Sequence, residues 1–444
     1  MDPSIDVGTY KPEQGVHKIT DYRCVSRDHQ HTSIKQRLYL HLDINCFYAQ
    51  VEQKSFNLWG MPVYVGGWYR GKKGTPRGIV ATSSYEARGY GIKTGMSAFE
   101  AEQICPWAIG LQAHYEKYKG ISQLLEELLQ GFTMTVEKYS MDEFFLDINH
   151  LKHQSDEELL LYCKELRYLI HKELGLVVSI GVANSKTYSK LASDLRKPNG
   201  ITIVTTSENE QSTLYPLPLD EIWGIGPRRF KKLKGRNICT IKDAFERGYP
   251  PFQKLFGAYF GKILWEMATG RDRARVLTDY QLTKEQLDYN HTFSEQSTDP
   301  AQVRGELIKG ISELAYRMRA YRIRSSHYYC FLGLQDRDTR GIGFAFTTDG
   351  NTHLDDYITY ECMKKAKLYI EKIIGAGHAI RRVSIGTRKV DHSGQGQLFF
   401  QEDPNQRQFY LVQDAVNNRF GRKTIQKAAI LDSVPGKTHF LDRS

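Results

Sequence analysis

No stretch of this 444-residue sequence approaches the ~20 consecutive apolar residues that a membrane-spanning helix needs. The first residues, Met1 to Ser4, lack the basic and apolar regions of a secretory signal peptide. The seven cysteines include no C-x-x-C pair, which argues against a disulfide framework and against a structural zinc site. A G-x-x-x-x-G-K-[ST] phosphate loop is also missing. We therefore expect a cytoplasmic protein with reduced thiols and no membrane partner.

The composition is that of a globular chain rich in basic residues. Hydrophobic residues make up 40% of the sequence, and the mean hydropathy is −0.50. A chain of 444 residues is too long for one ordinary core, so about two to four domains are expected. The net charge of +10 predicts a polyanionic partner, although charge alone does not distinguish nucleic acid from an anionic lipid surface.

The acidic pair Asp142 and Glu143 precedes the aromatic and aliphatic run 144–146, which has the composition of a buried strand. Carboxylates beside apolar surface need cations, hydrogen-bond donors or a metal ion, because an unpaired buried charge is costly. Two interpretations are open, a solvated strand end and a metal site. Since side chains alternate along a strand, both carboxylates reach one pair of metal ions only if the strand bends at its start.

Another carboxylate ends the first segment that is expected to be ordered. The alternation in residues 38–45 predicts a strand with Asp43 near its end and leucines on the opposite face. Phe47 and Tyr48 follow directly, and a helix is expected to continue after them. Residues 1–36, before this strand, are polar and without periodicity, which predicts a disordered N-terminal extension.

Basic and hydroxyl side chains gather in the next part of the chain. Glycines and cations alternate within residues 66–78, which predicts a mobile, positively charged loop, with a solvated hairpin as the alternative. A group of hydroxyls with one guanidinium then begins a short helix, and it includes Thr82, Tyr85 and Arg88. Such donors bind phosphate readily. Lys197 lies in a turn further along, where a solvated cation is the ordinary interpretation.

From about residue 205 the pattern is helical and basic. Gly224 and Gly226 would expose backbone N–H groups between two predicted helices, and Arg228 begins a run of cations. This arrangement indicates a helix-hairpin-helix that binds a duplex phosphate, or else a plain helical turn with a solvated basic face.

The polar residues 279–288 predict a linker, and an α/β unit follows them. Arginines cluster at the ends of its predicted strands, and positive strand edges can follow a phosphate backbone without reading bases. Those assigned to DNA binding are Arg322, Arg324, Arg381 and Arg382. Beyond this unit, apolar residues within the polar segment 395–400 indicate either a docking peptide or a packed end.

Five motifs, in order along the chain, resemble those of the Y-family, or translesion, DNA polymerases. They are D-I-N-C-F-Y-A-Q-V-E from Asp43, A-T-S-S-Y-E-A-R from Ala81, S-M-D-E from Ser140, R-K-P-N-G from Arg196 and W-G-I-G from Trp223. The resemblance implies an α+β multidomain fold of the right-hand polymerase type. Its palm would comprise 37–46 and 114–204, its fingers 47–113, its helical thumb 205–278 and its α/β little finger 289–391, with a C-terminal tail at 392–444.

The resemblance also implies roles for single residues. Asp43, Asp142 and Glu143 would be the catalytic metal ligands, joined by the backbone carbonyl of Ile44, and would hold a pair of Mg²⁺ ions, or Mn²⁺ in their place. Tyr48 would be the steric gate that excludes a ribose 2′-hydroxyl. The residues implied in nucleotide binding are Phe47, Tyr48, Thr82, Tyr85, Arg88 and Lys197.

The implied partners are primer–template DNA and a dNTP, bound by a monomer. The fingers motifs resemble bacterial DNA polymerase IV, whereas residues 43–45 and the segment after residue 400 resemble the catalytic subunit of DNA polymerase V. A need for accessory mutagenesis subunits is therefore left open. Gln395, Leu398 and Phe400 resemble the Q-x-x-L-x-F peptide that binds a sliding clamp.

The implied activity is template-directed, low-fidelity DNA synthesis across lesions, as part of DNA repair and SOS-response mutagenesis. A catalytically silent DNA-binding scaffold is the alternative, but relatives of that kind lack the acidic metal ligands that this chain retains. A nucleotide cyclase with the same palm chemistry would explain neither the hairpin glycines nor a basic domain after a linker.

Overall fold

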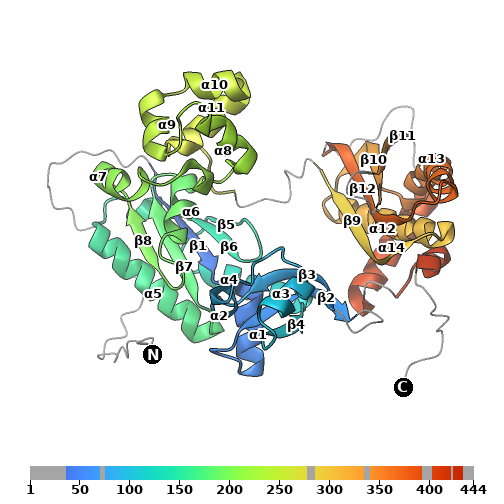
Figure 1. Ribbon diagram of the computed structural model, residues 1–444, viewed down its shortest axis with the longest axis horizontal. Coiled ribbons are helices and arrows are strands. Elements are labelled where there is room, and N and C mark those ends of the chain that lie inside the picture. Colours follow the sequence, from blue (N-terminus) through green and yellow to red (C-terminus); the bar gives the residue numbers. More distant parts are fainter. Residues whose placement is uncertain are drawn as a thin grey trace.

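A computed structural model describes residues 37–70, 76–277, 286–334, 341–392, 403–421 and 424–433. The expected N-terminal extension at 1–36 and the clamp-like peptide at 395–400 lie outside the described residues. One of the three sheets has four strands, and Figure 1 shows it and its helices set apart from the rest of the chain. Within the described ranges, no helix combines the length and the apolar character that a membrane crossing would require.

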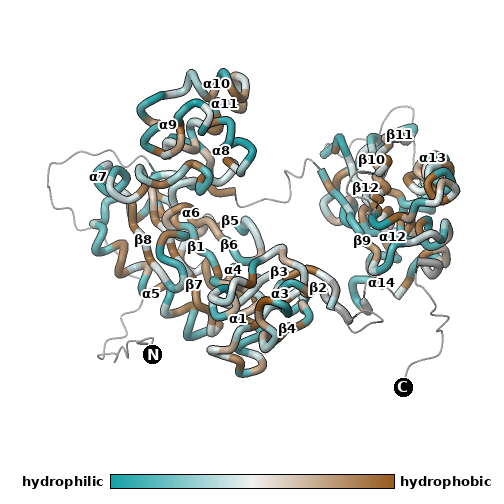
Figure 2. The backbone as a smooth tube through the Cα atoms, viewed as in Figure 1, coloured by the Kyte–Doolittle hydropathy of each residue, from teal (hydrophilic) through white to brown (hydrophobic). Residues whose placement is uncertain are grey.

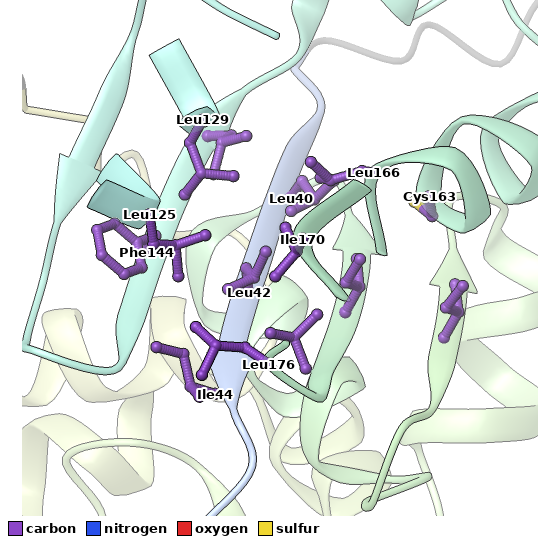
Figure 3. Close-up of a cluster of buried hydrophobic side chains, with 14 of the residues drawn as sticks. Leu40, Leu42, Ile44, Leu125, Leu129, Phe144, Cys163, Leu166, Ile170 and Leu176 are labelled. Atoms are coloured by element: carbon purple, nitrogen blue, oxygen red, sulfur yellow. The ribbon is translucent and has the colours of Figure 1, made fainter. Parts of the chain in front are cut away.

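The first sheet has five strands in the order β5-β6-β1-β7-β8, and only the pair β7–β8 is parallel. Its strands are β1 (Tyr39–Ile44), β5 (Val136–Lys138), β6 (Glu143–Asp147), β7 (Val178–Ala183) and β8 (Ile201–Val204). Helices α4 (Tyr115–Gln130) and α5 (Asp156–Leu174) supply apolar side chains to the core beside it, which Figure 3 shows in close-up. The leucines of β1 lie in this core, as their alternation predicts.

Local sequence signals set both ends of α5. Ser155 and Glu158 form a capping box at its start, and Gly175, at a φ of 63°, ends it. The short helix η1 (Asn149–Leu151) lies just before it. Helix α6 (Lys186–Asp194) packs on β7, β1 and β8, and Ser185 caps its start. A Cβ atom at Gly181 would lie 2.1 Å from the Ser189 carbonyl oxygen, so glycine is what permits this close approach.

A second, three-stranded sheet has the order β3-β2-β4. This region contains α1 (Phe47–Phe56), β2 (Val63–Arg70), β3 (Pro76–Ser83), α2 (Tyr85–Gly89), α3 (Ala98–Ile104) and β4 (Ile109–Gln112). The prediction of a loop throughout 66–78 is wrong and the alternative of a hairpin is closer, because residues 66–70 and 76–78 belong to antiparallel strands that pair with each other. The glycines fit that pairing, since a Cβ atom at Gly66 would lie 2.1 Å from the Ile79 carbonyl oxygen. Strand β4 was not predicted.

A helical region follows β8. It consists of α7 (Ser207–Asn209), the π-helical turn η2 (Glu210–Leu214), the 3₁₀ turn η3 (Leu219–Glu221), α8 (Pro227–Lys234), α9 (Ile241–Arg247), α10 (Pro250–Phe256) and α11 (Ala258–Ala268). The first helix of the predicted hairpin is therefore only the turn η3. Gly224, at a φ of 90°, and Gly226, the N-cap of α8, form the turn between η3 and α8.

The last sheet has the order β11-β10-β12-β9, with antiparallel neighbours throughout. The elements are β9 (Asp288–Ser297), α12 (Pro300–Ala320), β10 (Arg324–Leu334), β11 (Ile342–Thr352), α13 (Asp355–Gly375), β12 (Ile380–Asp391), α14 (Pro404–Phe420) and η5 (Ala428–Ser433). Its core is separate from that of the five-stranded sheet, and Figure 2 shows hydrophobic residues gathered between this sheet and its helices.

Two features of this unit differ from the prediction. Strand β9 was missed because its sequence is polar and it lies at the edge of the sheet, where side chains such as Asn290 are exposed. Leu287 is buried in the core of the unit, so the folded unit begins before residue 288, where the predicted linker was expected to end.

The C-terminal helix α14 is anchored on α12, where Arg319 pairs with Asp414 at 2.6 Å.

Candidate metal and nucleotide site

The three predicted carboxylates meet at one end of the five-stranded sheet. Asp43 on β1 and Glu143 on β6 are directly opposed in the antiparallel register. Asp142 precedes β6 in a turn, and its carbonyl oxygen accepts a hydrogen bond of 2.9 Å from the Ile44 N–H. The turn provides the change of direction that the alternation of a straight strand would not give. The backbone thus brings Asp43, Asp142 and Glu143 together.

Each of these carboxylates has a different partner. Lys197 Nζ lies 2.8 Å from Asp43 Oδ2. Lys190 forms an ion pair with Oε1 of Glu143. Ser140 Oγ donates to Asp142 Oδ1 at 2.5 Å. Burial raises the pKa of Asp43 to about 6, against the opposing effect of Lys197.

The chemistry of this donor set fits a divalent cation. Hard carboxylate oxygens are the ligands that Mg²⁺ and Mn²⁺ prefer, and the neighbouring charges of Glu143 and Asp142 contribute to the raised pKa of Asp43. A bound cation would relieve that repulsion. In the described part of the chain, however, no three Asp, Glu, His or Cys side chains gather closely enough to hold an ion. The carboxylates are neighbours whose side chains are turned to Lys197, Lys190 and Ser140.

Lys197 is held by a network that the sequence did not reveal. Its Nζ lies 2.7 Å from Asp194 Oδ1 as well as close to Asp43. Burial lowers the pKa of Lys197, but the two carboxylates outweigh this effect and raise it. Asn45 holds the turn that contains Lys197, because its Oδ1 accepts a hydrogen bond of 2.8 Å from the Asn199 N–H. Lys197 is therefore paired with two carboxylates and is not an ordinary solvated cation.

The predicted phosphate-binding side chains lie beside the carboxylates. Burial raises the pKa of Tyr85, and the charges of Arg88, Lys197 and Asp43 also act on it, which places the four groups in one neighbourhood. The Arg88 guanidinium carbon lies 4.8 Å from the centre of the Tyr85 ring. Its Nε donates to the Ser83 carbonyl oxygen at 3.1 Å. Thr82 is on the adjacent strand β3.

Tyr48 is fixed by other aromatic rings. It stacks on Tyr118 with ring centres 4.3 Å apart and an interplanar angle of 15°. Tyr118 is itself held, since its hydroxyl donates to Glu52 Oε1 at 2.7 Å. Burial raises the pKa of Tyr48 to about 12, and the charge of Asp142 adds to the effect. The Phe47 side chain is 2% exposed and packs in the core, so a nucleotide contact of this residue would have to come from its backbone at the start of α1.

The turn with Gly224 and Gly226 follows a residue that contacts the segment just before the acidic pair. Trp223, just before Gly224, packs edge-on against Tyr139 with ring centres 5.2 Å apart. Gly226 has open space where a Cβ atom would lie, and Arg228 is exposed on α8. An open backbone beside exposed cations is suited to an approaching phosphate.

The four predicted arginines of the last sheet do not share one surface. Arg382 lies over the Phe331 ring at 5.3 Å and lines a groove of about 400 Å³ on the sheet. Arg381, its neighbour in the strand, instead donates to the Ser294 carbonyl oxygen at 2.9 Å. Arg322 is exposed after α12, and Arg324 begins β10. A further cation, Arg388, lies over Tyr329 at 5.4 Å and lines the same groove. Side chains an even number of positions apart on a strand share a face, so Arg388 could have been predicted from Arg382 on β12.

Comparisons with known proteins agree on one family. Residues 42–194 match the family model described as impB/mucB/samB family. DNA polymerase IV 1 of Bacillus subtilis (strain 168) is 30% identical over 410 residues, which are 91% of this chain and 95% of that protein. DNA polymerase IV of Alkalilimnicola ehrlichii is 32% identical over 288 residues, which are 65% of this chain and 77% of that protein.

Solved structures show the same fold. A Y-family DNA polymerase chimera of Dbh and Dpo4 has a TM-score of 0.67 at 23% identity, with 79% of this chain and 98% of the chimera covered. An insertion ternary complex of Dbh DNA polymerase has a TM-score of 0.52 at 22% identity, with 80% and 99% covered. These similarities confirm the predicted α+β right-hand polymerase fold.

Proposed function

The chain belongs to the Y-family DNA polymerases, the impB/mucB/samB family, and we propose that Asp43, Asp142 and Glu143 form the metal site at which it extends a primer. It is a DNA-directed DNA polymerase of translesion synthesis and DNA repair, as its DNA polymerase IV relatives indicate. The scaffold alternative is not favoured. The observation that carries the proposal is the opposed register of Asp43 and Glu143, with the Ile44 N–H bonded to the Asp142 carbonyl.

The polymerase uses divalent metal ions, and we propose that Mg²⁺ fills this role, with Mn²⁺ as a substitute. When bound, a pair of such ions would lower the pKa of the primer 3′-hydroxyl and neutralise the leaving pyrophosphate. The chain's own contribution is a backbone that brings Asp43, Glu143 and the preceding Asp142 together at one end of the sheet, while their side chains would turn from Lys197, Lys190 and Ser140 toward the ions. The carbonyl of Ile44 is proposed as an additional ligand.

DNA and an incoming dNTP are the partners of the reaction. Arg88, Tyr85 and Lys197 are proposed to bind the triphosphate, with Thr82 beside them, because a guanidinium and an ammonium on one side of the carboxylates attract its charge. Lys197 would move from Asp43 to the phosphates as the metal takes over that carboxylate. Ile79, which is 55% exposed, is proposed to contact the nascent base pair.

Tyr48 is proposed to be the steric gate. Its ring is fixed by stacking on Tyr118, so it would not yield to a ribose 2′-hydroxyl. Tyr48→Ala should therefore admit ribonucleotides into primer extension products. The measurement is the ratio of kcat/KM for dNTP and rNTP in single-nucleotide incorporation. Tyr90→Ala, which removes an exposed ring elsewhere in the fingers, is the control. Unchanged sugar discrimination in Tyr48→Ala would remove this role.

DNA contacts are proposed for two regions. In the thumb they comprise Gly224, Gly226 and Arg228. In the little finger they comprise Arg322, Arg324, Arg381 and Arg382, with Arg382 as the strongest candidate since its guanidinium faces the groove. We propose palm, fingers and thumb at the ranges given by the family resemblance, and a little finger that begins at Leu287.

The remaining partners are proposals from the sequence. Gln395, Leu398 and Phe400 are proposed to bind a sliding clamp, and accessory mutagenesis subunits remain candidates for the C-terminal segment. A monomer acting in the cytoplasm is proposed. Deleting 395–400 should reduce processivity only when the clamp is present, which separates this peptide from the catalytic parts.

The metal assignment is tested by primer extension with Mg²⁺ on undamaged and abasic templates. The double variant Asp142→Ala, Glu143→Ala should lose at least about 10³-fold in extension rate, because the metal site supplies several kcal/mol of transition-state stabilisation. Primer–template binding should stay nearly unchanged. Asp147→Asn is the matched control on the same strand, because it retains the oxygen that accepts a hydrogen bond from the Asn149 N–H. Extension by the double variant at the wild-type rate would refute the assignment.

A further inference from the structure

Two lysines from one segment of the chain neutralise two of the proposed metal ligands. Lys190 is on α6 and pairs with Glu143, whereas Lys197 follows the end of that helix and pairs with Asp43. Lys197 has a second proposed task at the triphosphate. Lys190 has no other carboxylate partner among the described residues, and the catalytic chemistry proposed above does not use it.

Glu143 lies in a largely buried position where Lys190 is its cationic partner. The two side chains are 18% and 17% exposed, so the pair is largely withdrawn from solvent. His41 Nε2 lies 4.0 Å from the same oxygen, Oε1, and is buried without a hydrogen-bond partner. Across the described ranges, Oε2 of Glu143 has no hydrogen-bond donor. The ammonium of Lys190 is therefore the cation that compensates this carboxylate.

The packing of α6 fixes where that ammonium lies. Ser193 Oγ donates to the Lys190 carbonyl oxygen at 2.7 Å. The same hydroxyl is 2.8 Å from His41 Nδ1 on β1. Helix α6 is also seated closely on β7 at Gly181. Lys190 thus projects from a helix that is fastened to the strands carrying the carboxylates, and its side chain is only 18% exposed.

We propose that Lys190 supplies the counter-charge of Glu143 before metal binds, so that a divalent cation must displace its ammonium or share the carboxylate with it. The inference rests on the proposed metal site. Both routes oppose metal binding, because two cations near one carboxylate repel each other and screening is weak at low exposure. Lys190 would therefore keep the free enzyme folded with its acids compensated and weaken metal binding until a nucleotide brings its own negative charge.

The direction in which metal affinity changes when Lys190 is replaced distinguishes this role from one in which Lys190 only orients Glu143. If Lys190 supplies a competing charge, removing the charge strengthens metal binding by the free enzyme. If Lys190 only held Glu143 in a productive rotamer, removing it would weaken metal binding, since the ligand would lose its orientation. The measurement must use enzyme without DNA or nucleotide, because the triphosphate changes the local charge.

Mn²⁺ binding to the full chain, followed by the electron paramagnetic resonance signal of free Mn²⁺, is the direct test. Lys190→Met should bind Mn²⁺ at least about fivefold more tightly than wild type. Lys190→Arg keeps the charge and should retain wild-type affinity. Lys242→Met removes an equal charge from an exposed thumb pair and should also leave the affinity unchanged. Unchanged or weaker Mn²⁺ binding by Lys190→Met would overturn the proposal.

A second readout covers variants that fold poorly. Without metal, Lys190→Met and Lys190→Gln should melt at a lower temperature than wild type, because Glu143 then faces Asp43 and Asp142 without its cation. Added Mn²⁺ should raise their melting temperatures more than it raises that of wild type; an equal or smaller rise would contradict the proposal.

Asp43→Ala separates the proposed metal site from the proposed role of Lys190. Mn²⁺ binding that survives this substitution would contradict the metal site itself, whereas a failure confined to Lys190 variants contradicts only its proposed role.

Discussion

The five-stranded sheet, assigned to the palm, and the four-stranded sheet, assigned to the little finger, share a layout. They differ in what their positively charged side chains contact. Two helices pack on one side of each, α4 and α5 in the palm and α12 and α13 in the little finger. In the palm, α6 packs against the sheet as well and directs its lysines to carboxylates. In the little finger, Arg382 and Arg388 lie over aromatic rings beside a groove. They have no carboxylate partner among the described residues.

This difference separates cations whose charge is balanced within the chain from cations whose charge can act on a bound polyanion. The α6 lysines Lys186 and Lys190 compensate acids that belong to the chain itself, so their charge is already used in the folded protein. Little-finger arginines rest on rings, which orient the guanidinium without neutralising it. Their charge remains free for an external polyanion. Net positive charge alone would not have separated these two uses.

The comparison predicts that removing a buried palm cation affects folding most. Lys186 is 7% exposed, and its Nζ lies 2.7 Å from Glu137 Oε2, which is 3% exposed. Lys186→Met should lower the free energy of unfolding by about 3–5 kcal/mol, because it leaves Glu137 buried and unpaired. Denaturant unfolding monitored by circular dichroism measures this loss.

The double variant Lys186→Met, Glu137→Leu is the control. Removing both charges should recover much of the lost stability, since no buried carboxylate is left without a cation. Glu137 also accepts a hydrogen bond of 2.6 Å from the Leu277 N–H, so recovery should be incomplete. If Lys186→Met were as stable as wild type, the palm lysines would not differ from surface cations.

The little-finger arginines should show the opposite behaviour, and a smaller effect. The double variant Arg382→Ala, Arg388→Ala should leave the free energy of unfolding within about 0.5 kcal/mol of wild type. Its affinity for primer–template DNA should fall by at least about tenfold near 0.1 M salt, because two phosphate contacts are lost. The slope of log affinity against log salt should decrease by about 2. Fluorescence anisotropy across a salt series measures both.

A cation on the far side of the same unit provides the matched control. Lys364 is on α13, 51% exposed and paired with Glu361. Lys364→Ala should change neither DNA affinity nor the salt slope. An equal loss of affinity in Lys364→Ala would mean that DNA binding follows net charge and not the groove, which would remove the contrast between the two sheets.

Elements specified by near neighbours were predictable. The capping boxes at Ser97 and Ser155 can be read from the sequence, because each joins residues three apart. The leucine alternation of β1 also gave its buried face. Strands β4 and β9 were missed, since their pairing depends on partners elsewhere in the sheet and their own sequences are weakly patterned.

The sequence by itself determined which acids are present, the order of the five motifs and the family to which they belong. Tertiary structure decided which cation each acid contacts, since Lys190 and Glu143 are 47 residues apart. It also buried Phe47, fixed Tyr48 on Tyr118 and separated Arg381 from Arg382. The physical reason is that caps and alternation act between residues close in sequence, whereas charge compensation depends on distances that only the packing of α6, β1 and β6 sets.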